Sequence, residues 1–256
     1  MKIQLLVATM NQCDYSLLDK MNVQSDAIIG NQCERNSIES FEYKGYRIKY
    51  LNFDERGVGL NRNNALMRAD GDICLLADDD MRYVDNYPYI VSKAFEEIPS
   101  ADLIVFNIDG NVDSRPDALV PKQIRFYNYM RYGTARIAFR MSSIRNQGIF
   151  FNLCFGGGTK HGHGEDTLFL TDCLRKGLKI YAVPVNLATL MDERESTWFK
   201  GYDEKYLRDQ GALYKAISKA YWRLLCLQDA VRKYKVYRRS WYSAYKLMIC
   251  GGENNA

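Results

Sequence analysis

Short apolar runs and helical patterns alternate through the first half of the chain. The apolar runs predict buried strands over residues 3–8, 26–30, 48–53, 73–77 and 103–107. The segments between them predict helices over residues 15–21, 59–69 and 87–98. Alternating strands and helices are typical of an α/β fold with a mostly parallel, doubly wound sheet, in which ligands bind beyond the carboxyl ends of the strands.

The second half is polar and glycine-rich at first and then becomes helical. A helix is predicted from Glu165 to Lys176, followed by a short strand over residues 180–183 that ends at Pro184. Beyond Thr197, apolar residues recur at helical spacing. We therefore expect an α/β domain over residues 1–195 and a helical extension over residues 196–256.

The composition fits a globular protein of this kind. The chain has 256 residues, of which 47% are hydrophobic, so it can build a substantial core. No apolar run reaches the roughly 18 residues expected of a membrane span, and the first residues lack the pattern of a secretory signal. The seven cysteines are scattered without a C-x-x-C pair, which predicts free thiols in a cytoplasmic protein.

The positive charge is concentrated at the end of the chain. Residues 219–256 carry eight basic side chains against two acidic ones, interleaved with aromatic residues, although the whole chain has a net charge of +4. This pattern suits contact with an anionic membrane through residues 219–249. The alternatives are packing on the α/β domain or a second subunit, as in a homodimer, and binding of single-stranded nucleic acid. Because the rest of the chain is not basic, we expect no nucleic-acid partner.

Three consecutive carboxylates, Asp78, Asp79 and Asp80, follow the predicted strand at residues 73–77. In an extended segment Asp78 and Asp80 would point the same way. Mg²⁺ and Mn²⁺ prefer oxygen ligands and often bind one or two carboxylates together with substrate phosphates. The pattern indicates a cation site that holds a diphosphate, and a solvated acidic turn is the alternative.

A second acidic pair, Glu165 and Asp166, begins the helix predicted after residue 164. A carboxylate at a helix N-terminus is kept ionised and could act as a general base, although acidic residues are also common there for structural reasons. The preceding His161 and His163 could instead bind a transition metal, but no third ligand lies nearby in the sequence.

Glycines and an arginine open the helix predicted at residues 59–69. Gly57 and Gly59 would let the backbone approach a ligand, and Arg62 could bind phosphate. Such residues near a helix start are also often structural.

Taken in order, these segments resemble the family 2 glycosyltransferases of the GT-A fold, of the type found in bacterial polysaccharide synthesis. The matching segments are the first strand up to Thr9, residues 59–65, residues 69–80 and residues 164–169. The resemblance implies an inverting, hexosyltransferase-type transfer from a nucleotide-sugar. It places the nucleotide-sugar half at about residues 1–108 and the acceptor half at about residues 109–195.

The resemblance also implies roles for individual residues. Asp78 and Asp80 correspond to the D-x-D motif and are the expected ligands of Mn²⁺ or Mg²⁺, and Asp166 corresponds to the catalytic base. Many relatives end the second strand with an aspartate that contacts the nucleobase, and here the amides of Asn31 and Gln32 are expected to replace it. A UDP-sugar is the favoured donor and a dTDP-sugar the main competitor. The residues expected to bind the nucleotide-sugar are Thr9, Asn31, Gln32, Arg62, Asp78 and Asp79.

The expected acceptor is a saccharide or a lipid-linked saccharide, in capsule, exopolysaccharide or other cell-surface glycan synthesis. The protein would then work in the cytoplasm, at the inner face of the membrane. Two alternatives stay open: a nucleotidyltransferase of similar fold, and a non-catalytic binding protein that retains the fold. The first also uses carboxylates and a metal, but it has no need of an acidic pair on the acceptor side.

Overall fold

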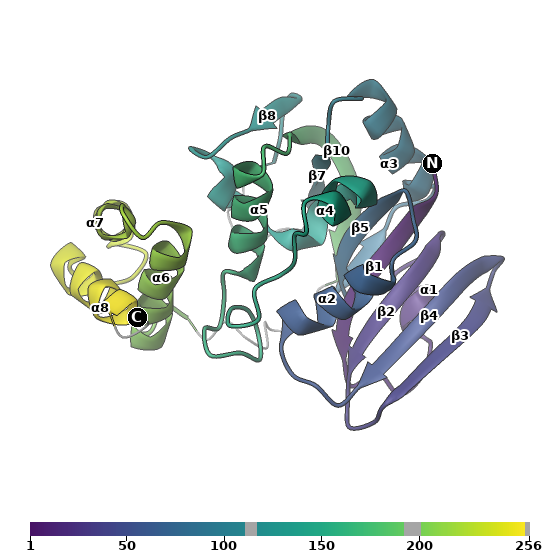
Figure 1. The fold of residues 1–256 in the computed structure, drawn as a ribbon, viewed down its shortest axis with the longest axis horizontal. Helices are drawn as coiled ribbons and strands as arrows, with labels where there is room; N and C mark the ends of the chain where they lie inside the picture. The colour runs from purple at the N-terminus through teal and green to yellow at the C-terminus, as the bar shows by residue number, and fades with distance from the viewer. Residues whose placement is uncertain (111–116, 192–200, 254–256) are drawn as a thin grey trace.

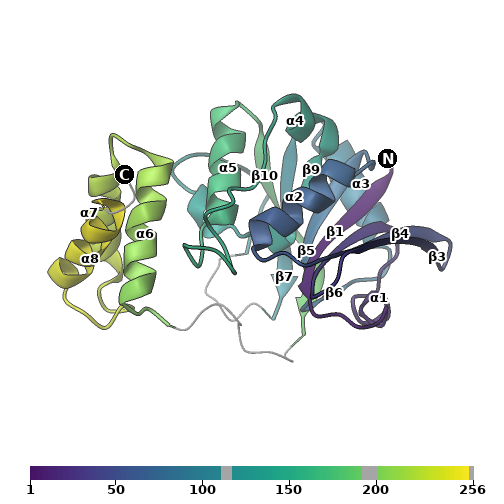
Figure 2. The same ribbon diagram turned by 60° about the horizontal axis from the view of Figure 1, so that its bottom comes forward.

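The computed structural model describes residues 1–110, 117–191 and 201–253. A twisted sheet forms one part of the molecule, and the last three helices form a cluster beside it (Figure 1). In the turned view, as in the first, α5 (Glu165–Arg175) lies between this cluster and the sheet (Figure 2). The α/β fold class predicted from the alternating pattern is confirmed.

Parallel strands form the half of the sheet nearer the N-terminus. They are β1 (Ile3–Met10), β2 (Asp26–Gln32), β4 (Tyr46–Phe53) and β5 (Ile73–Asp78), in the spatial order β4-β2-β1-β5. Leu5 and Leu75 face one hydrophobic cluster, which also includes side chains of α1 (Leu17–Lys20) and α3 (Tyr87–Glu97). Leu6 and Leu76 face the other, with α2 (Val58–Arg68), α4 (Met141–Asn146) and α5. Because both faces are buried, residues 5–8 of β1 and 73–77 of β5 are continuous apolar runs in the sequence.

Several elements were not predicted from the sequence. The edge strand β3 (Ser37–Tyr43) pairs antiparallel with β4 through a turn in which Lys44 and Gly45 have positive φ. A short strand, β9 (Ile137–Arg140), lies antiparallel between β5 and β7 (Leu103–Asp109). The other unpredicted elements are β6 (Met81–Tyr83), β8 (Lys122–Ile124), α4 and the 3₁₀ turns at Tyr129–Arg131 and Thr134–Arg136.

The predicted end of the last strand at Pro184 is wrong. Strand β10 runs from Ile180 to Leu190 and pairs parallel with β7 on both sides of the proline. Its register against β7 shifts between Ala182 and Asn186, and such irregularities accommodate a residue that cannot donate a backbone hydrogen bond.

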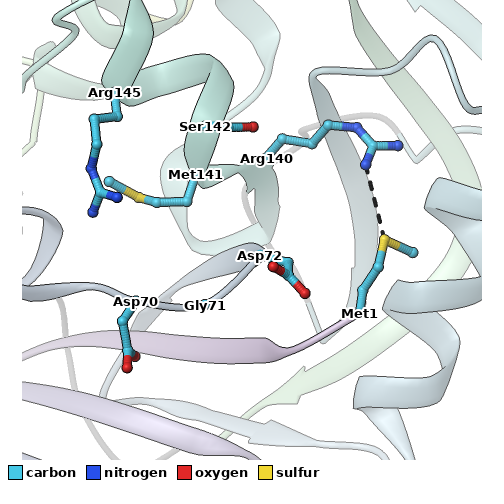
Figure 3. A pocket seen from close by; sticks show the side chains of 8 residues that line it. All are labelled: Met1, Asp70, Gly71, Asp72, Arg140, Met141, Ser142 and Arg145. Atoms are coloured by element: carbon cyan, nitrogen blue, oxygen red, sulfur yellow. Dashed lines mark hydrogen bonds between the residues drawn. The ribbon is translucent and has the colours of Figure 1, made fainter.

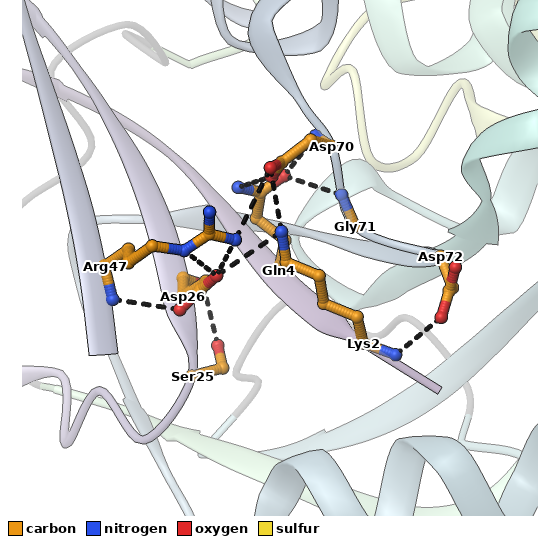
Figure 4. A network of polar contacts seen from close by, with 8 residues as sticks. All are labelled: Lys2, Gln4, Ser25, Asp26, Arg47, Asp70, Gly71 and Asp72. Atoms are coloured by element: carbon orange, nitrogen blue, oxygen red, sulfur yellow. Dashed lines mark hydrogen bonds and ion pairs between the residues drawn. The ribbon is translucent and has the colours of Figure 1, made fainter. Parts of the chain in front are cut away.

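A charged network fastens the amino ends of the parallel strands (Figure 4). The Asp26 carboxylate accepts from the Arg47 guanidinium at 2.8 Å, and Lys2 forms an ion pair of 2.8 Å with Asp70. The Gln4 side-chain oxygen accepts the backbone N–H groups of Asp70 and Gly71. Residues 70–72 of the recognised motif therefore hold the sheet together at the edge opposite the carboxyl ends of β1 and β5.

The C-terminal extension consists of α6 (Glu204–Ile217), α7 (Trp222–Lys233) and α8 (Trp241–Glu253). The expected boundary at residues 195–196 lies outside the described residues. Helices α6 and α8 cross at very short distance. A Cβ atom added to Gly211 would lie only 1.8 Å from the Met248 carbonyl oxygen. A Cβ atom on Gly251 would likewise lie 2.0 Å from the Arg208 carbonyl oxygen. Two backbones can approach this closely only at glycine.

None of the helices in the described ranges combines the length and the apolar character required to cross a bilayer.

Candidate active site

The acidic triplet lies at the carboxyl edge of the parallel strands. Asp78 is the last residue of β5 and is the register partner of Ala8 in β1. The hydroxyl of Thr9, the next residue of β1, donates to the Asp79 carboxylate at 2.6 Å. The predicted proximity of Thr9 and the triplet is therefore present, and it lies where α/β sheets bind ligands.

The Arg62 guanidinium joins this triplet to the second acidic pair. Its Nη2 donates to Asp78 at 2.6 Å and its Nη1 donates to Glu165 at 2.8 Å, and the side chain is buried. Burial alone would lower the pKa of Arg62, but the two carboxylates outweigh it and raise the pKa above its usual value. The two acidic segments therefore lie on either side of one permanently charged group.

Helix α2 presents Arg62 to the site because its buried face is polar. The Asn63 side chain donates to the Phe151 carbonyl and accepts the Phe151 N–H, which fixes the helix against the loop before α5. A Cβ atom on Gly59 would lie 2.5 Å from the Asn152 carbonyl oxygen, so glycine permits this close approach. The Arg62 Nε is buried and has no hydrogen-bond partner among the described residues.

The second acidic pair occupies the first turn of α5. Gly164, at φ 106°, turns the chain into this helix, and the Asp166 carboxylate accepts the Thr167 N–H at 2.6 Å. Burial, followed by the neighbouring Asp166 charge, raises the pKa of Glu165 even though Arg62 opposes this shift. Burial is thus the main reason that the protonated form of Glu165 is favoured, and Arg62 is the group that opposes it.

The carboxylates around Arg62 bear on the implied cation. A nucleoside diphosphate would add further negative charge beside them, and a bound cation would reduce the repulsion. The available ligands are carboxylate oxygens, which suit Mg²⁺ or Mn²⁺. In the part of the chain that the structure describes, no three His, Cys, Asp or Glu side chains are grouped closely enough to hold an ion. The donor set therefore fits a cation that shares its coordination between one or two carboxylates and the substrate phosphates.

The geometry of the triplet differs from the sequence-based expectation in one respect. Asp79 and Asp80 form a turn between β5 and β6, so the alternation of an extended segment does not apply to Asp78 and Asp80. One Asp78 oxygen is held by Arg62, whereas Asp80 is exposed. Of the two expected metal ligands, Asp80 is the more accessible.

Asn31 and Gln32, which were expected to contact a nucleobase, form hydrogen bonds within the fold. Asn31 is fully buried; its side chain accepts the Gln12 N–H and donates to the Gln12 carbonyl and to Asn52. The Gln32 side chain accepts the Gly57 N–H at the start of α2. A base contact by the Asn31 amide would require its bonds to break, whereas the bond that Gln32 accepts occupies only its side-chain oxygen. The sequence pattern at this position did not indicate that the two amides form hydrogen bonds within the fold.

The two histidines contact α6 and do not form a metal pair. His161 Nδ1 lies 3.0 Å from the Asp209 carboxylate. The same carboxylate accepts the Gly162 N–H at 2.9 Å and forms an ion pair with Lys205. His163 Nε2 lies 2.9 Å from the Gln210 side chain, and its ring stacks on Tyr206. Burial lowers the pKa of His163. The extension thus holds the loop that leads into Glu165.

Sequence reasoning missed some residues that shape the site. Asp209 and Gln210 hold the loop at residues 161–163, but a polar pair on a helix carries no sign of a partner more than 40 positions away. The Gln12 side chain donates to the Thr9 hydroxyl at 2.9 Å, and its place after the first strand was the only available signal.

A pocket elsewhere on the molecule is unrelated to this site. It lies at the amino ends of β1 and β5, where Met1 and Asp72 face Arg140 and Arg145 (Figure 3). Both arginines are already bound to backbone carbonyls, Arg140 to Ala101 and Arg145 to Ala69. Both guanidinium groups therefore take part in holding this end of the fold together.

Comparisons with known proteins agree with the geometry. Residues 34–155 match the model of glycosyl transferase family 2, which confirms the resemblance seen in the motifs. The match includes Arg62 and the acidic triplet and ends before Glu165. No curated protein sequence matches the chain.

Solved structures of S. aureus TarS are similar in fold. The fragment 1–349 in complex with UDP-GlcNAc aligns with a TM-score of 0.63 at 14% identity, covering 100% of this chain and 79% of that one. The same fragment with UDP aligns with a TM-score of 0.63 at 13% identity, covering 100% and 90%. A longer TarS structure gives 0.61 at 14%, and there the alignment covers 91% of this chain but only 44% of the other. These likenesses establish a GT-A-type fold.

Proposed function

We propose that this protein is a metal-dependent, inverting glycosyltransferase that moves a sugar from a nucleotide-sugar to a saccharide acceptor. The observation that carries the proposal is the double ion pair of Arg62, which brings the D-x-D segment and the acidic pair of α5 to one place. The family match over residues 34–155 supports the same class of reaction.

On the donor side, the nucleotide-sugar would bind beyond the ends of β1 and β5. Thr9 and Asp79 lie together there, and Arg62 holds one oxygen of Asp78, which would lie beside the bound nucleotide. A divalent cation bound at Asp80 would neutralise the charge that develops on the departing diphosphate. A UDP-sugar is the favoured donor, supported by the similar fold of TarS in complex with UDP-GlcNAc and with UDP.

On the acceptor side, Asp166 would take the proton from the attacking hydroxyl. The hydroxyl oxygen forms a bond to the anomeric carbon as the bond to the diphosphate breaks on the opposite face, so the configuration inverts. Glu165, held by Arg62, fixes the first turn of α5 and with it the position of Asp166. The acceptor would be a saccharide or lipid-linked saccharide of a cell-surface glycan.

The acidic pair distinguishes this proposal from the alternatives. A nucleotidyltransferase or a binding protein of the same fold has no use for an acidic pair on the acceptor side, next to the arginine that holds the D-x-D segment. No contact among the described residues favours either alternative.

The cation and the nucleotide are tested together by thermal shift. UDP with Mn²⁺ should raise the melting temperature more than other nucleoside diphosphates do, because ligands that bind only the folded state stabilise it. Asp80→Ala should remove the Mn²⁺-dependent part of this shift, whereas Glu97→Ala, an exposed acid on α3, should retain it. A shift that is the same with and without Mn²⁺ would contradict the metal assignment.

The base is tested by Asp166→Asn. Transfer should fall by about a hundredfold or more, the range that general bases supply, while the UDP-dependent thermal shift is retained. Asp172→Asn, on the same helix and half exposed, is the matched control and should remain active. Equal loss of transfer and nucleotide binding would instead point to a structural role for Asp166.

A further inference from the structure

Helix α7 is apolar on two opposite faces. Trp222, Cys226 and Ala230 are buried in the hydrophobic cluster that α7 shares with α6 and α8. On the other side, Leu224, Leu227 and Val231 follow one another at helical spacing and are 63%, 36% and 50% exposed. A helix of a soluble unit usually has one apolar face, so a second one indicates a second partner.

Exposed aromatic residues also flank α7 in the sequence. They are Tyr221 before the helix, Tyr234 at its end, and Trp241 and Tyr242 at the start of α8. Isolated exposed apolar side chains are normal on a protein surface, but a continuous series along one helix marks an interaction site. We call the set of Leu224, Leu227, Val231 and these aromatic residues the α7 face.

The charges around the α7 face are almost all positive. Arg232, Lys235 and Arg238 are exposed and form no ion pair within the described ranges of the chain. The acidic residues nearby are neutralised: Asp229 is buried and bound to Lys233 and Tyr237, and Glu253 pairs with Arg223. Whatever covers the α7 face is therefore expected to carry negative charge.

We propose that the α7 face docks the protein on an anionic lipid bilayer. Leucine and valine would enter the boundary between headgroups and acyl chains, tyrosine and tryptophan would lie at headgroup depth, and the basic side chains would meet the acidic headgroups. A second copy of this chain is disfavoured as the occupant, because a twofold contact would bring the same unpaired cations together. The inference does not depend on the proposed function, since it concerns binding and not transfer.

Docking there would also hold the candidate site in a fixed position relative to the membrane. Helix α6 contacts α7 within one hydrophobic cluster and holds the loop at residues 161–163 through Asp209 and Gln210. An acceptor that is anchored in the same bilayer would then meet a site held at a fixed distance from it.

Vesicle co-sedimentation of the full chain tests the proposal. The probes are phosphatidylcholine vesicles and vesicles that also contain phosphatidylglycerol. The protein should sediment with the anionic vesicles and not with the neutral ones, and the bound fraction should fall as salt is raised. Absence of binding to anionic vesicles at low salt would overturn the proposal.

Variants distinguish binding through the α7 face from non-specific adsorption to vesicles. The triple change Leu224→Ser, Leu227→Ser and Val231→Ser should lower the apparent affinity for anionic vesicles by about tenfold or more. Its control is a triple change of equally exposed apolar residues on the α/β domain, Ile38→Ser, Met67→Ser and Tyr89→Ser, which should bind like the wild type. Unchanged binding by the α7 triple would contradict the assignment.

The basic residues need a matched pair of their own. Arg232→Gln with Lys235→Gln should lower the affinity by about tenfold, because each basic residue near an anionic surface adds to the attraction. Lys176→Gln with Lys179→Gln, on the α/β domain, should not. Melting temperatures of all variants confirm that they are folded. If light scattering instead shows a dimer that the α7 triple dissociates, the face is a contact between copies and the membrane proposal is wrong.

Discussion

A single guanidinium joins the two halves of the candidate site. Arg62 has two partners, and Asp78 lies 16 positions from it while Glu165 lies 103 positions away. Because all three groups are wholly or partly buried, the pairing affects folding as well as chemistry. Removing one member of a buried ionic group leaves the others uncompensated.

Arg62→Gln should therefore destabilise the protein. We expect a loss of about 3–5 kcal/mol in the free energy of unfolding, the range for removing one partner of a buried ion pair, measured by urea denaturation. Adding Glu165→Gln should recover part of this loss, since it removes one uncompensated carboxylate. Arg68→Gln, at a half-buried position of the same helix, should cost far less, and similar losses for Arg62→Gln and Arg68→Gln would refute the explanation.

At this scale the sequence predicts residue types better than partners. Arg62, Thr9 and the acidic segments were named from their motifs, and the structure brings them together. The amide of Asn31 was expected to face a nucleobase, yet it is consumed by Gln12 and Asn52. The partner of a hydrogen-bonding side chain depends on which residues lie near it in space. A local sequence pattern does not show those residues.

Helix α6 controls the loop before α5 through one carboxylate. Burial alone would raise the pKa of Asp209, but the contacts with Lys205, the Gly162 N–H and His161 outweigh it and lower the pKa below its ordinary value of 3.8. The folded state thus favours the ionised form. This stabilisation is present above pH 3.8 and is lost as the pH falls below it.

Asp209→Asn should weaken this contact in a pH-dependent way. At pH 7 we expect a loss of about 1.5–3 kcal/mol, as for hydrogen bonds to a charged group, and the difference from the wild type should shrink below pH 3.8. Thermal unfolding between pH 7 and pH 3 measures both. A difference for Asp209→Asn that stays constant with pH would exclude its charge as the cause.

The elements that the sequence predicted are those buried on both faces. Strands β1 and β5 contain apolar runs because successive residues, such as Leu5 and Leu6, face hydrophobic clusters on opposite sides of the sheet. The edge strand β3 alternates between half-buried and exposed positions, and a Lys44-Gly45 turn follows it, so its signal was present but weaker. The continuation of β10 beyond Pro184 could not be predicted, because it depends on pairing with β7.

At the scale of the whole molecule, the extension and the α/β domain share one hydrophobic cluster. Phe155 and Leu168 of the α/β domain are buried together with Leu213 of α6 and with residues of α7 and α8. The sequence predicted both parts and their order, but not this contact, because an apolar helix face does not specify what covers it. The two parts are expected to unfold together.

Calorimetry tests this coupling. The full chain should unfold in one transition whose calorimetric and van't Hoff enthalpies agree. Leu213→Ala should lower the temperature of that single transition, by the equivalent of about 2–5 kcal/mol, the usual cost for a buried leucine. Two resolved transitions, of which the variant shifts only one, would show that the extension is an independent unit.

The glycine crossing of α6 and α8 has a practical outcome. Where Gly211 and Gly251 let two backbones meet, neither helix can roll or slide without a collision, so α6 and α8 keep a fixed crossing, and α7 packs on them in the same hydrophobic cluster. The exposed residues of α7 could therefore be replaced, for example to direct the protein to a resin or a different vesicle, while the helices beneath them keep their arrangement.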